Sequence, residues 1–390
     1  MLTRSSSLNE NRNINILLAS ASIIVIGVWP LLMSLLSERL QLNISQQGRV
    51  ISAESIGMVL GTLASIWLSR SGNIKRTLII SLAVGVLMNI LTAQVSGLTP
   101  LLLCRFIVGV SAGVCYSLSI FQLGRMPGAD RSFSLSLALQ TILFSLYAVV
   151  FPLIAERFGY SIAINTLTAW FVVMLLASIF LKKVTFKPEN KNTRPAEISS
   201  DSSFNASLAG LVGMTFLQVA VYSVWGYIAN IGQGNQLSDV QIGTAFGIGL
   251  IGGLPGALLT GFLIPRVGRV ALSVCGSLLV LFSVLSFYFF KLTAIHFTLC
   301  ILILNFGWML ALSAYMAMVA HEDKSGKLTR LIGFIQIGGA TLAPVLIAFI
   351  ATGNGLTIIY AISCAGAIAA AVVPLLTLPG RVRKNIIEEL

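Results

Sequence analysis

Charged residues are scarce in this chain, and acidic residues are the scarcest. Of 390 residues only 10% are charged, with 13 Asp and Glu against 25 Lys and Arg, whereas 56% are hydrophobic and the mean hydropathy is +0.92. A soluble globular domain carries about 25% charged residues. This composition therefore excludes an ordinary soluble protein and predicts a protein of the lipid bilayer.

Sequence patterns that hold metals or cofactors are also lacking. The two histidines, His296 and His321, are isolated, and none of the five cysteines belongs to a C-x-x-C pair. The cysteines lie inside apolar runs, where a thiol acts as a small packing residue. We therefore expect no metal, no other cofactor and no catalytic residues.

Nucleotide and nucleic-acid signals are equally weak. No G-x-x-x-x-G-K-[ST] sequence is present, and GIGLIG at 247–252 has no strand-helix-strand unit around it, so we interpret it as close helix packing. The net charge of +12 arises from short basic clusters between apolar runs, not from one basic face. We expect neither an enzyme nor a nucleic-acid-binding protein.

Long apolar stretches are abundant. A helix needs about 20 residues to cross the hydrocarbon core of a bilayer, and these runs lack the alternation of a membrane barrel. The sequence predicts an all-α membrane protein with twelve spans, at 14–36, 46–68, 77–96, 99–122, 132–155, 159–181, 207–230, 240–264, 270–290, 295–320, 330–352 and 356–378.

The distribution of basic residues predicts the orientation of these spans. With the N-terminus in the cytoplasm, twenty Lys and Arg fall on the cytoplasmic side and three, Arg39, Arg157 and Lys291, on the outer side. Short cytoplasmic loops carry such an excess of positive charge. We expect an integral protein of a bacterial inner membrane with both termini in the cytoplasm.

The chain also divides into two similar halves. One long polar stretch, rich in Ser, Asn, Pro and charge, interrupts the apolar pattern. Arg70 and Gly72 in the first half are separated from Arg266 and Gly268 in the second by the same number of residues. We expect an N-terminal six-helix bundle at 1–181, a cytoplasmic linker at 182–206 and a C-terminal six-helix bundle at 207–390, related by duplication.

Two motifs resemble those of the major facilitator superfamily of secondary transporters. GFLIPRVGR, from Gly261 to Arg269, is similar to the cytoplasmic motif of that family, and SIWLSRSGNI is its counterpart in the first half. The acid of the family motif is replaced by Ser69 and Pro265, so we expect the tight glycine turn but not the usual charge relay. Arg105 with Gly109 and Gly113 resembles a second family motif, R-x-x-x-G-x-x-x-G.

This resemblance covers essentially the whole chain. It implies two pseudo-symmetric six-helix bundles around a central substrate site, with alternating access to the two sides of the membrane. It also implies that the loops of Arg70, Gly72, Arg266 and Gly268 take part in cytoplasmic gating.

Polar and aromatic side chains recur at helical spacing inside the predicted spans. The resemblance implies that the fourth, seventh and tenth spans line a cavity, whereas the alternative is that these side chains only hold helices together. The candidate substrate-binding residues are Arg105, Tyr116, Gln140, Tyr147, Gln218, Tyr222, Trp225, Asn305, Trp308, Tyr315 and Gln336.

Glu54 is the one carboxylate well inside a predicted span. It and Arg105 both lie about 10 Å below the outer end of their helices, at 1.5 Å per residue, so they can meet. A carboxylate beside a cation can bind and release a proton when their separation changes. We expect Glu54 to be a proton-coupling site and Arg105 its partner or a clamp for a substrate anion. A static salt bridge, or a Glu54 that faces outer water beside Arg49, is the alternative.

Three functions fit these observations. The first is proton-coupled transport of a small organic solute, an organic anion or an amphiphilic aromatic compound, by a monomer. The second is efflux of drugs or metabolites by proton antiport, although YAVVFPLIAE at 147–156 lacks the glycines of the family's exporter motif. The third is a membrane receptor or sensor, which would require an additional soluble domain.

Overall fold

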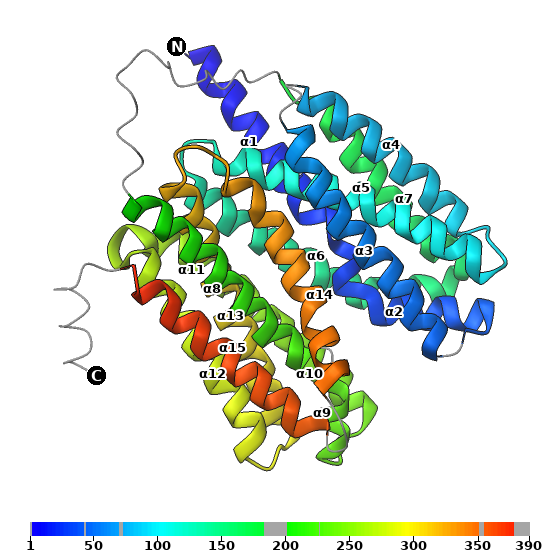
Figure 1. The fold of residues 1–390 in the computed structure, drawn as a ribbon. Coiled ribbons are helices and arrows are strands. Elements are labelled where there is room, and N and C mark those ends of the chain that lie inside the picture. Colours follow the sequence, from blue (N-terminus) through cyan, green and yellow to red (C-terminus); the bar gives the residue numbers. More distant parts are fainter. Residues whose placement is uncertain are drawn as a thin grey trace. The chain divides into compact units, whose positions relative to one another are not determined.

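The fold of the chain is helical throughout the part that the structure describes. A computed structural model describes residues 2–42, 44–69, 73–182, 201–225, 227–350 and 355–377, and contains no strand in these ranges (Figure 1). The described residues fall into two compact units: unit 1 within Met1–Met126 and Leu139–Thr185, and unit 2 within Pro127–Ala138 and Phe186–Leu390. All-α architecture is thus confirmed.

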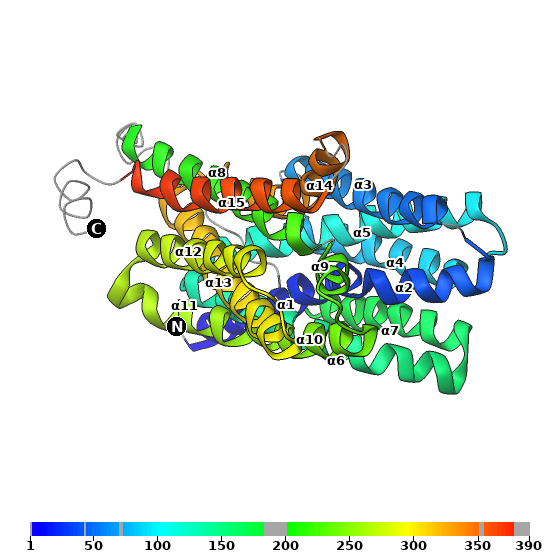
Figure 2. The same ribbon diagram turned by 90° about the horizontal axis from the view of Figure 1, so that it is seen from below.

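Unit 1 is built around one central helix, α5. The apolar run of Leu98–Gly124 gives a helix of 27 residues, most of which is buried. Helices α3 and α4 lie along α5 in both ribbon views (Figures 1 and 2), and α1 also contacts it. The bounds of the other helices are α1 Leu2–Ser22, α2 Ile24–Leu40, α3 Ile44–Leu68, α4 Ile74–Thr92, α6 Ala129–Phe158 and α7 Tyr160–Ile179.

Unit 2 is arranged around a corresponding helix, α13. It runs from Ala294 to Glu322, is largely buried, and contacts α8, α10, α11 and α12. The bounds of the elements in this unit are α8 Asp201–Trp225, α9 Ile228–Gly234, α10 Asp239–Ile251, α11 Gly253–Val267, α12 Arg269–Phe289, α13 Ala294–Glu322, η1 Thr329–Leu331, α14 Ile332–Ile350 and α15 Gly355–Leu375. The first ten residues of α6 also belong to unit 2.

The same neighbour pattern appears in both units. In unit 1, α5 packs against α1, α3 and α4, and α4 packs against α7; in unit 2, α13 packs against α8, α10–α11 and α12, and α12 packs against α15. This repetition is what a duplicated bundle produces.

Glycines allow the closest of these helix contacts. A Cβ atom on Gly109 would lie 2.1 Å from the backbone oxygen of Glu54, and one on Gly57 would lie 2.2 Å from that of Phe106. In unit 2, a Cβ atom on Gly252 would lie 2.2 Å from the backbone oxygen of Leu302. Small residues let helix backbones approach in this way inside membranes.

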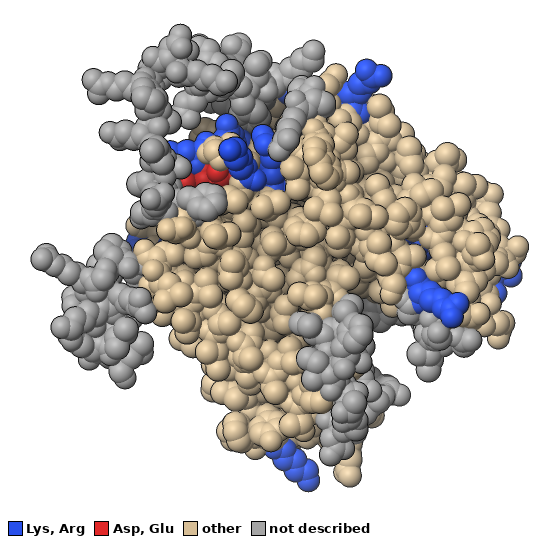
Figure 3. Space-filling model, in the orientation of Figure 1, with Lys and Arg blue, Asp and Glu red and all other residues tan. Residues whose placement is uncertain are grey.

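The helices have the length and apolarity that a bilayer requires. Nine helical stretches of the described residues are long and apolar enough to span a membrane. Figure 3 shows a broad surface without charged side chains, with Lys and Arg near its margins. Large apolar side chains such as Trp67 in unit 1 and Phe262 and Phe289 in unit 2 are exposed.

Each predicted span coincides with helical residues in the described ranges, but three spans are interrupted. The first is divided at Ile23 and starts at Leu2, because the polar N-terminal residues continue the helix that apolarity alone predicts from residue 14. The seventh ends at Trp225 and continues as α9. The eighth is divided at Gly252, and Pro255 lies in the first turn of α11, where its missing N–H costs no helical hydrogen bond.

Candidate functional site

Glu54 and Arg105 form a buried ion pair in unit 1. Arg105 Nη2 donates a hydrogen bond to Glu54 Oε1, and the two side chains are only 0% and 1% exposed. The predicted contact between these residues is therefore present. Neither side chain reaches bulk water in this conformation, so Glu54 does not face outer water beside Arg49.

Two further side chains complete the surroundings of this pair. The Trp29 indole Nε1 of α2 donates to Glu54 Oε2 at 3.2 Å, and Arg105 Nη1 donates to Asn89 Oδ1 of α4 at 3.0 Å. Asn89 is held in turn by a bond of its Nδ2 to the Gly85 oxygen at 3.1 Å. Four helices, α2, α3, α4 and α5, thus each supply one polar side chain to the same site.

One donor of Arg105 has no hydrogen-bond acceptor. Its Nε is buried and has no partner among the described residues. An unmet N–H of a buried guanidinium costs free energy, and removing either member of a buried pair leaves an uncompensated charge. The pair is therefore sensitive to any change in the protonation of Glu54.

The glycine contact between α3 and α5 explains why the two charges meet. Gly109 lies one helical turn after Arg105 and touches the backbone oxygen of Glu54. Gly113 makes the same contact with the backbone oxygen of Met58, one turn further along each helix. The spacing of Arg105, Gly109 and Gly113 thus fixes the register in which the carboxylate lies beside the guanidinium.

A second polar and aromatic cluster lies in unit 2. Trp308 Nε1 donates to Gln218 Oε1 at 2.7 Å, and Gln218 Nε2 donates to the backbone oxygen of Gln336 at 3.0 Å. The Trp308 ring packs edge-on against Tyr222 at 5.4 Å and lies 6.4 Å from Trp225. Helices α8, α13 and α14 therefore contribute five of the predicted residues to one place.

The rim of this cluster remains accessible. Gln218, Trp308 and Gln336 are buried, whereas Tyr222 and Trp225 are half-buried. Trp225 also packs on Phe246 of α10, with ring centroids 4.7 Å apart. The arrangement presents aromatic surface backed by a fixed amide, which suits stacking on an apolar or aromatic part of a solute.

The remaining candidates are buried and several bond to neighbouring helices. Tyr147 bonds to Thr166 of α7, Tyr315 donates to the backbone oxygen of Ala370 in α15, and Asn305 donates to the Ile301 oxygen of its own helix at 2.9 Å. Tyr116 and Gln140 are buried in α5 and α6. The two hydroxyl groups and the Asn305 amide therefore hold helical structure in this conformation.

The gating residues are described only for the second half. Arg70 and Gly72 lie outside the described residues. Gly268 has φ of +89° and joins α11 to α12 in a tight turn, and Arg266 is exposed above the ring of Phe262 at 5.6 Å. Arg269 of the same motif is bonded by Nη2 to Asp130 Oδ2 at 2.6 Å. An acid at the start of α6 thus pairs with this loop, although Pro265 occupies the usual acidic position.

Three contributors escaped the sequence analysis: Trp29, Asn89 and Asp130. Asn89 was visible as an amide in the middle of an apolar span, which is a signal for a buried polar contact. Trp29 and Asp130 gave no comparable signal, because a tryptophan in a span or an acid in a short loop is ordinary.

Comparisons with known proteins agree with this architecture. The family model described as Major Facilitator Superfamily matches residues 14–340. Among solved structures, the transporter FucP of that superfamily, crystallised in the outward conformation, superimposes with a TM-score of 0.73 at 13% sequence identity, covering 95% of this chain and 98% of that chain. At this identity the likeness shows the fold alone. No protein in the curated set matches significantly.

The family match spans most of the chain, and the helical units repeat as a duplicated bundle does. The chain is therefore an integral membrane protein and not an enzyme. It belongs to the Major Facilitator Superfamily of secondary transporters.

Proposed function

We propose that this chain is a proton-coupled transporter of a small organic solute, and that Glu54 is the group that binds the proton. The observation that carries this proposal is the buried pair of Glu54 and Arg105. Arg105 is the one charged partner of this carboxylate among the described residues, so protonation of Glu54 changes the local charge balance.

The chemistry of the pair supports coupling in three steps. Protonation neutralises Glu54 and removes the charge that balances Arg105. The guanidinium, whose Nε already lacks an acceptor, then needs another anionic or polar partner. A solute anion supplies that partner through charge-assisted hydrogen bonds, so binding of the proton and of the solute favour each other.

The cluster in unit 2 supports the solute class. The half-buried Tyr222 and Trp225 rings offer stacking surface, and the buried Gln218 fixes Trp308. An organic anion or an amphiphilic aromatic compound fits a protein that carries both a cation and aromatic faces. We propose transport by a monomer in a bacterial inner membrane, with both termini in the cytoplasm, because the basic residues are so unequally distributed.

Transport into proteoliposomes tests this function. Wild-type protein and Glu54→Gln are reconstituted, a pH gradient is imposed, and uptake of radiolabelled aromatic and aliphatic carboxylates is followed. We expect the wild type to accumulate a solute with the gradient and Glu54→Gln to lose that accumulation while it still exchanges solute across the membrane. The matched control is Glu156→Gln, which neutralises an exposed carboxylate of α6.

Full gradient-driven accumulation by Glu54→Gln would eliminate the coupling role. Solute movement opposite to the proton would establish antiport and the efflux alternative.

A second measurement needs no substrate. Trp29 is one of five tryptophans and bonds directly to the Glu54 carboxylate. We expect a pH-dependent change of tryptophan fluorescence in the wild type that is lost in both Trp29→Phe and Glu54→Gln. An unchanged transition in Glu54→Gln would show that another group takes up the proton.

A further inference from the structure

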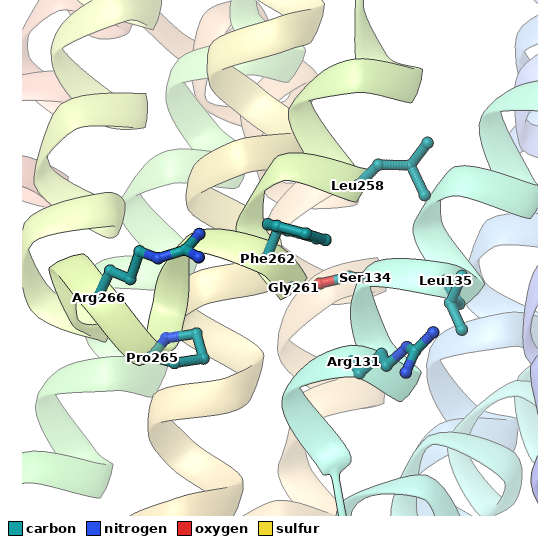
Figure 4. A pocket seen from close by; sticks show the side chains of 8 residues that line it. All are labelled: Arg131, Ser134, Leu135, Leu258, Gly261, Phe262, Pro265 and Arg266. Atoms are coloured by element: carbon teal, nitrogen blue, oxygen red, sulfur yellow. The ribbon is translucent and has the colours of Figure 1, made fainter.

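An unassigned cavity lies where α6 begins and α11 ends, wholly within unit 2. Its volume is about 480 Å³ (Figure 4). Figure 4 shows Arg131 of α6 and Arg266 of α11 on either side of it, with the Ser134 hydroxyl directed toward Gly261. The cavity is otherwise apolar, and its lining includes Leu135, Leu258, Phe262 and Pro265.

Both helices lead from this cavity into apolar, exposed surface. On α11 the exposed side chains before Arg266 are Leu258, at 44% exposure, and Phe262, at 69%. On α6, Leu135 lies one turn after Arg131 on the same face and also lines the cavity. Since the start of α6 meets the end of α11, both arginines lie at the same end of the apolar side chains of the cavity.

The charges of the cavity are not balanced by acids. Neither Arg131 nor Arg266 forms an ion pair with a carboxylate in the described ranges, and the Arg266 guanidinium lies over the face of the Phe262 ring. The acid next to Arg131 in sequence, Asp130, is occupied by Arg269, which bonds both of its oxygens, at 3.3 and 2.6 Å. The cavity therefore keeps two positive charges beside an apolar wall.

We propose that this cavity binds an anionic phospholipid. The phosphate lies between the guanidinium groups of Arg131 and Arg266, and an acyl chain follows Leu135, Leu258 and Phe262. Guanidinium groups recognise phosphate oxygens by charge-assisted hydrogen bonds, and basic pockets between membrane helices bind lipid head groups. A zwitterionic lipid fits less well, because none of the described residues that line the cavity is a carboxylate that could receive its ammonium group.

Native mass spectrometry of the purified full chain in detergent measures this binding directly. Palmitoyl-oleoyl phosphatidylglycerol and the matching phosphatidylethanolamine are titrated separately and in competition. The test variant is Arg131→Gln with Arg266→Gln. The matched control is Arg76→Gln with Lys327→Gln, which removes two exposed charges outside the cavity.

We expect the wild type and the control to prefer phosphatidylglycerol, and the test variant to bind it about 30-fold more weakly. This figure corresponds to about 1 kcal/mol for each arginine, with 1.4 kcal/mol for each factor of ten. Phe262→Ala, which changes an exposed side chain, should also weaken lipid binding.

Equal loss in the test variant and the control would show that only net charge matters and would overturn the site. Equal binding of the two lipids by the wild type would overturn it as well. Full competition by glycerol phosphate without acyl chains would assign the cavity to a soluble phosphate instead. The readout is lipid binding, so its outcome is independent of whether Glu54 couples transport to protons.

Discussion

Arg105 is costly to bury, because its guanidinium is fully buried on the central helix of unit 1. On insertion scales an arginine at the centre of a membrane helix costs about 3 kcal/mol. Here Glu54 and Asn89 take up two of its nitrogens. The planar fork places these two nitrogens toward separate acceptors at fixed positions, so the site depends on geometry as well as charge.

Replacing Arg105 by Lys tests this geometry. A lysine keeps the charge but carries a compact ammonium group, which cannot reproduce the two separate nitrogen positions from which the guanidinium bonds Glu54 and Asn89, and we expect a loss of about 1.5–3 kcal/mol for one weakened hydrogen bond to a charged group. The measurement is the unfolding midpoint of the purified protein in detergent. Arg39→Lys, which changes an exposed arginine above the Tyr160 ring, serves as the control and should match the wild type. An Arg105→Lys protein as stable as the wild type would contradict the role of the fork.

Gly109→Ala tests the register of α3 and α5. The added Cβ would lie 2.1 Å from the Glu54 backbone oxygen, and overpacking of this kind costs about 1–3 kcal/mol. We expect a lower unfolding midpoint and a weaker response of Trp29 fluorescence to pH. Gly247→Ala is the control, since a Cβ there meets nothing within 4 Å. Equal unfolding midpoints for Gly109→Ala and Gly247→Ala would show that α3 and α5 accommodate the added methyl group without loss of stability.

At the residue scale, the sequence predicted one contact of the site but not the partners of other site residues. The depth of Glu54 and Arg105 in their helices was enough to predict their contact, because rise per residue is fixed. The bonds of Tyr147 and Tyr315 to other helices could not be foreseen, because helical spacing gives the face of a residue and not its partner. The role of each site residue in transport stays a prediction.

At the scale of elements, the apolar pattern predicted where helices lie but not where they break. Hydrocarbon thickness sets the length of a span, whereas the interruptions at Ile23 and Gly252 depend on local packing. The GIGLIG segment shows the difference. Its close packing was expected, and Gly249 and Gly252 do lie against α13, but the restart of the helix at Gly253 was not.

We expect the stability of the loop after α13 to depend on pH through the Asp323 carboxyl. Asp323 accepts bonds from the Thr329 N–H at 2.7 Å, from the Thr329 hydroxyl at 2.9 Å and from the Ser325 hydroxyl at 2.7 Å. Burial alone would raise the pKa of this carboxyl, but these bonds outweigh it and hold the pKa below its ordinary value of 3.8. The ionised form therefore stabilises the loop.

Because the folded pKa is depressed, this stabilisation is present above pH 3.8 and is lost as the pH falls through the folded value. We expect Asp323→Asn to lower stability by about 1–3 kcal/mol at pH 7, and the difference from the wild type to shrink towards pH 3. Unfolding midpoints at the two pH values check this. Glu156→Gln is the control, and a difference that grows on acidification would reverse the assignment.

At the scale of the whole molecule, α6 is the helix shared by the two units. Its residues up to Ala138 pack with unit 2, and the rest belongs to unit 1. The contacts of the shared part are specific: Asp130 bonds to Arg269, and the Ser134 and Ser313 hydroxyls lie 2.9 Å apart. Sequence analysis placed α6 in the first bundle because it follows chain order, and long-range pairs of this kind leave no trace in local composition.

Orientation in the membrane is also a property of the whole chain. We expect the single-cysteine variants Arg76→Cys and Lys327→Cys to be protected from a membrane-impermeant maleimide in intact cells, and Lys291→Cys to react with it. All three positions are exposed. The exposed Cys275 and half-buried Cys364 are first replaced by alanine. Labelling of Arg76→Cys or Lys327→Cys in sealed cells would invert the proposed topology.

The four glycines between α3 and α5 limit how the pair of Glu54 and Arg105 can come apart. At Gly57, Gly61, Gly109 and Gly113 an added Cβ atom would lie 2.1–2.2 Å from a backbone oxygen of the facing helix, so the two backbones are in direct contact there. Glu54 and Arg105 therefore lie on two helices that form one tightly packed pair. Under the proposed coupling, protonation of Glu54 would therefore separate the pair by rotation of the two side chains, and Trp29 and Asn89, which bond to them from α2 and α4, would have to move with them.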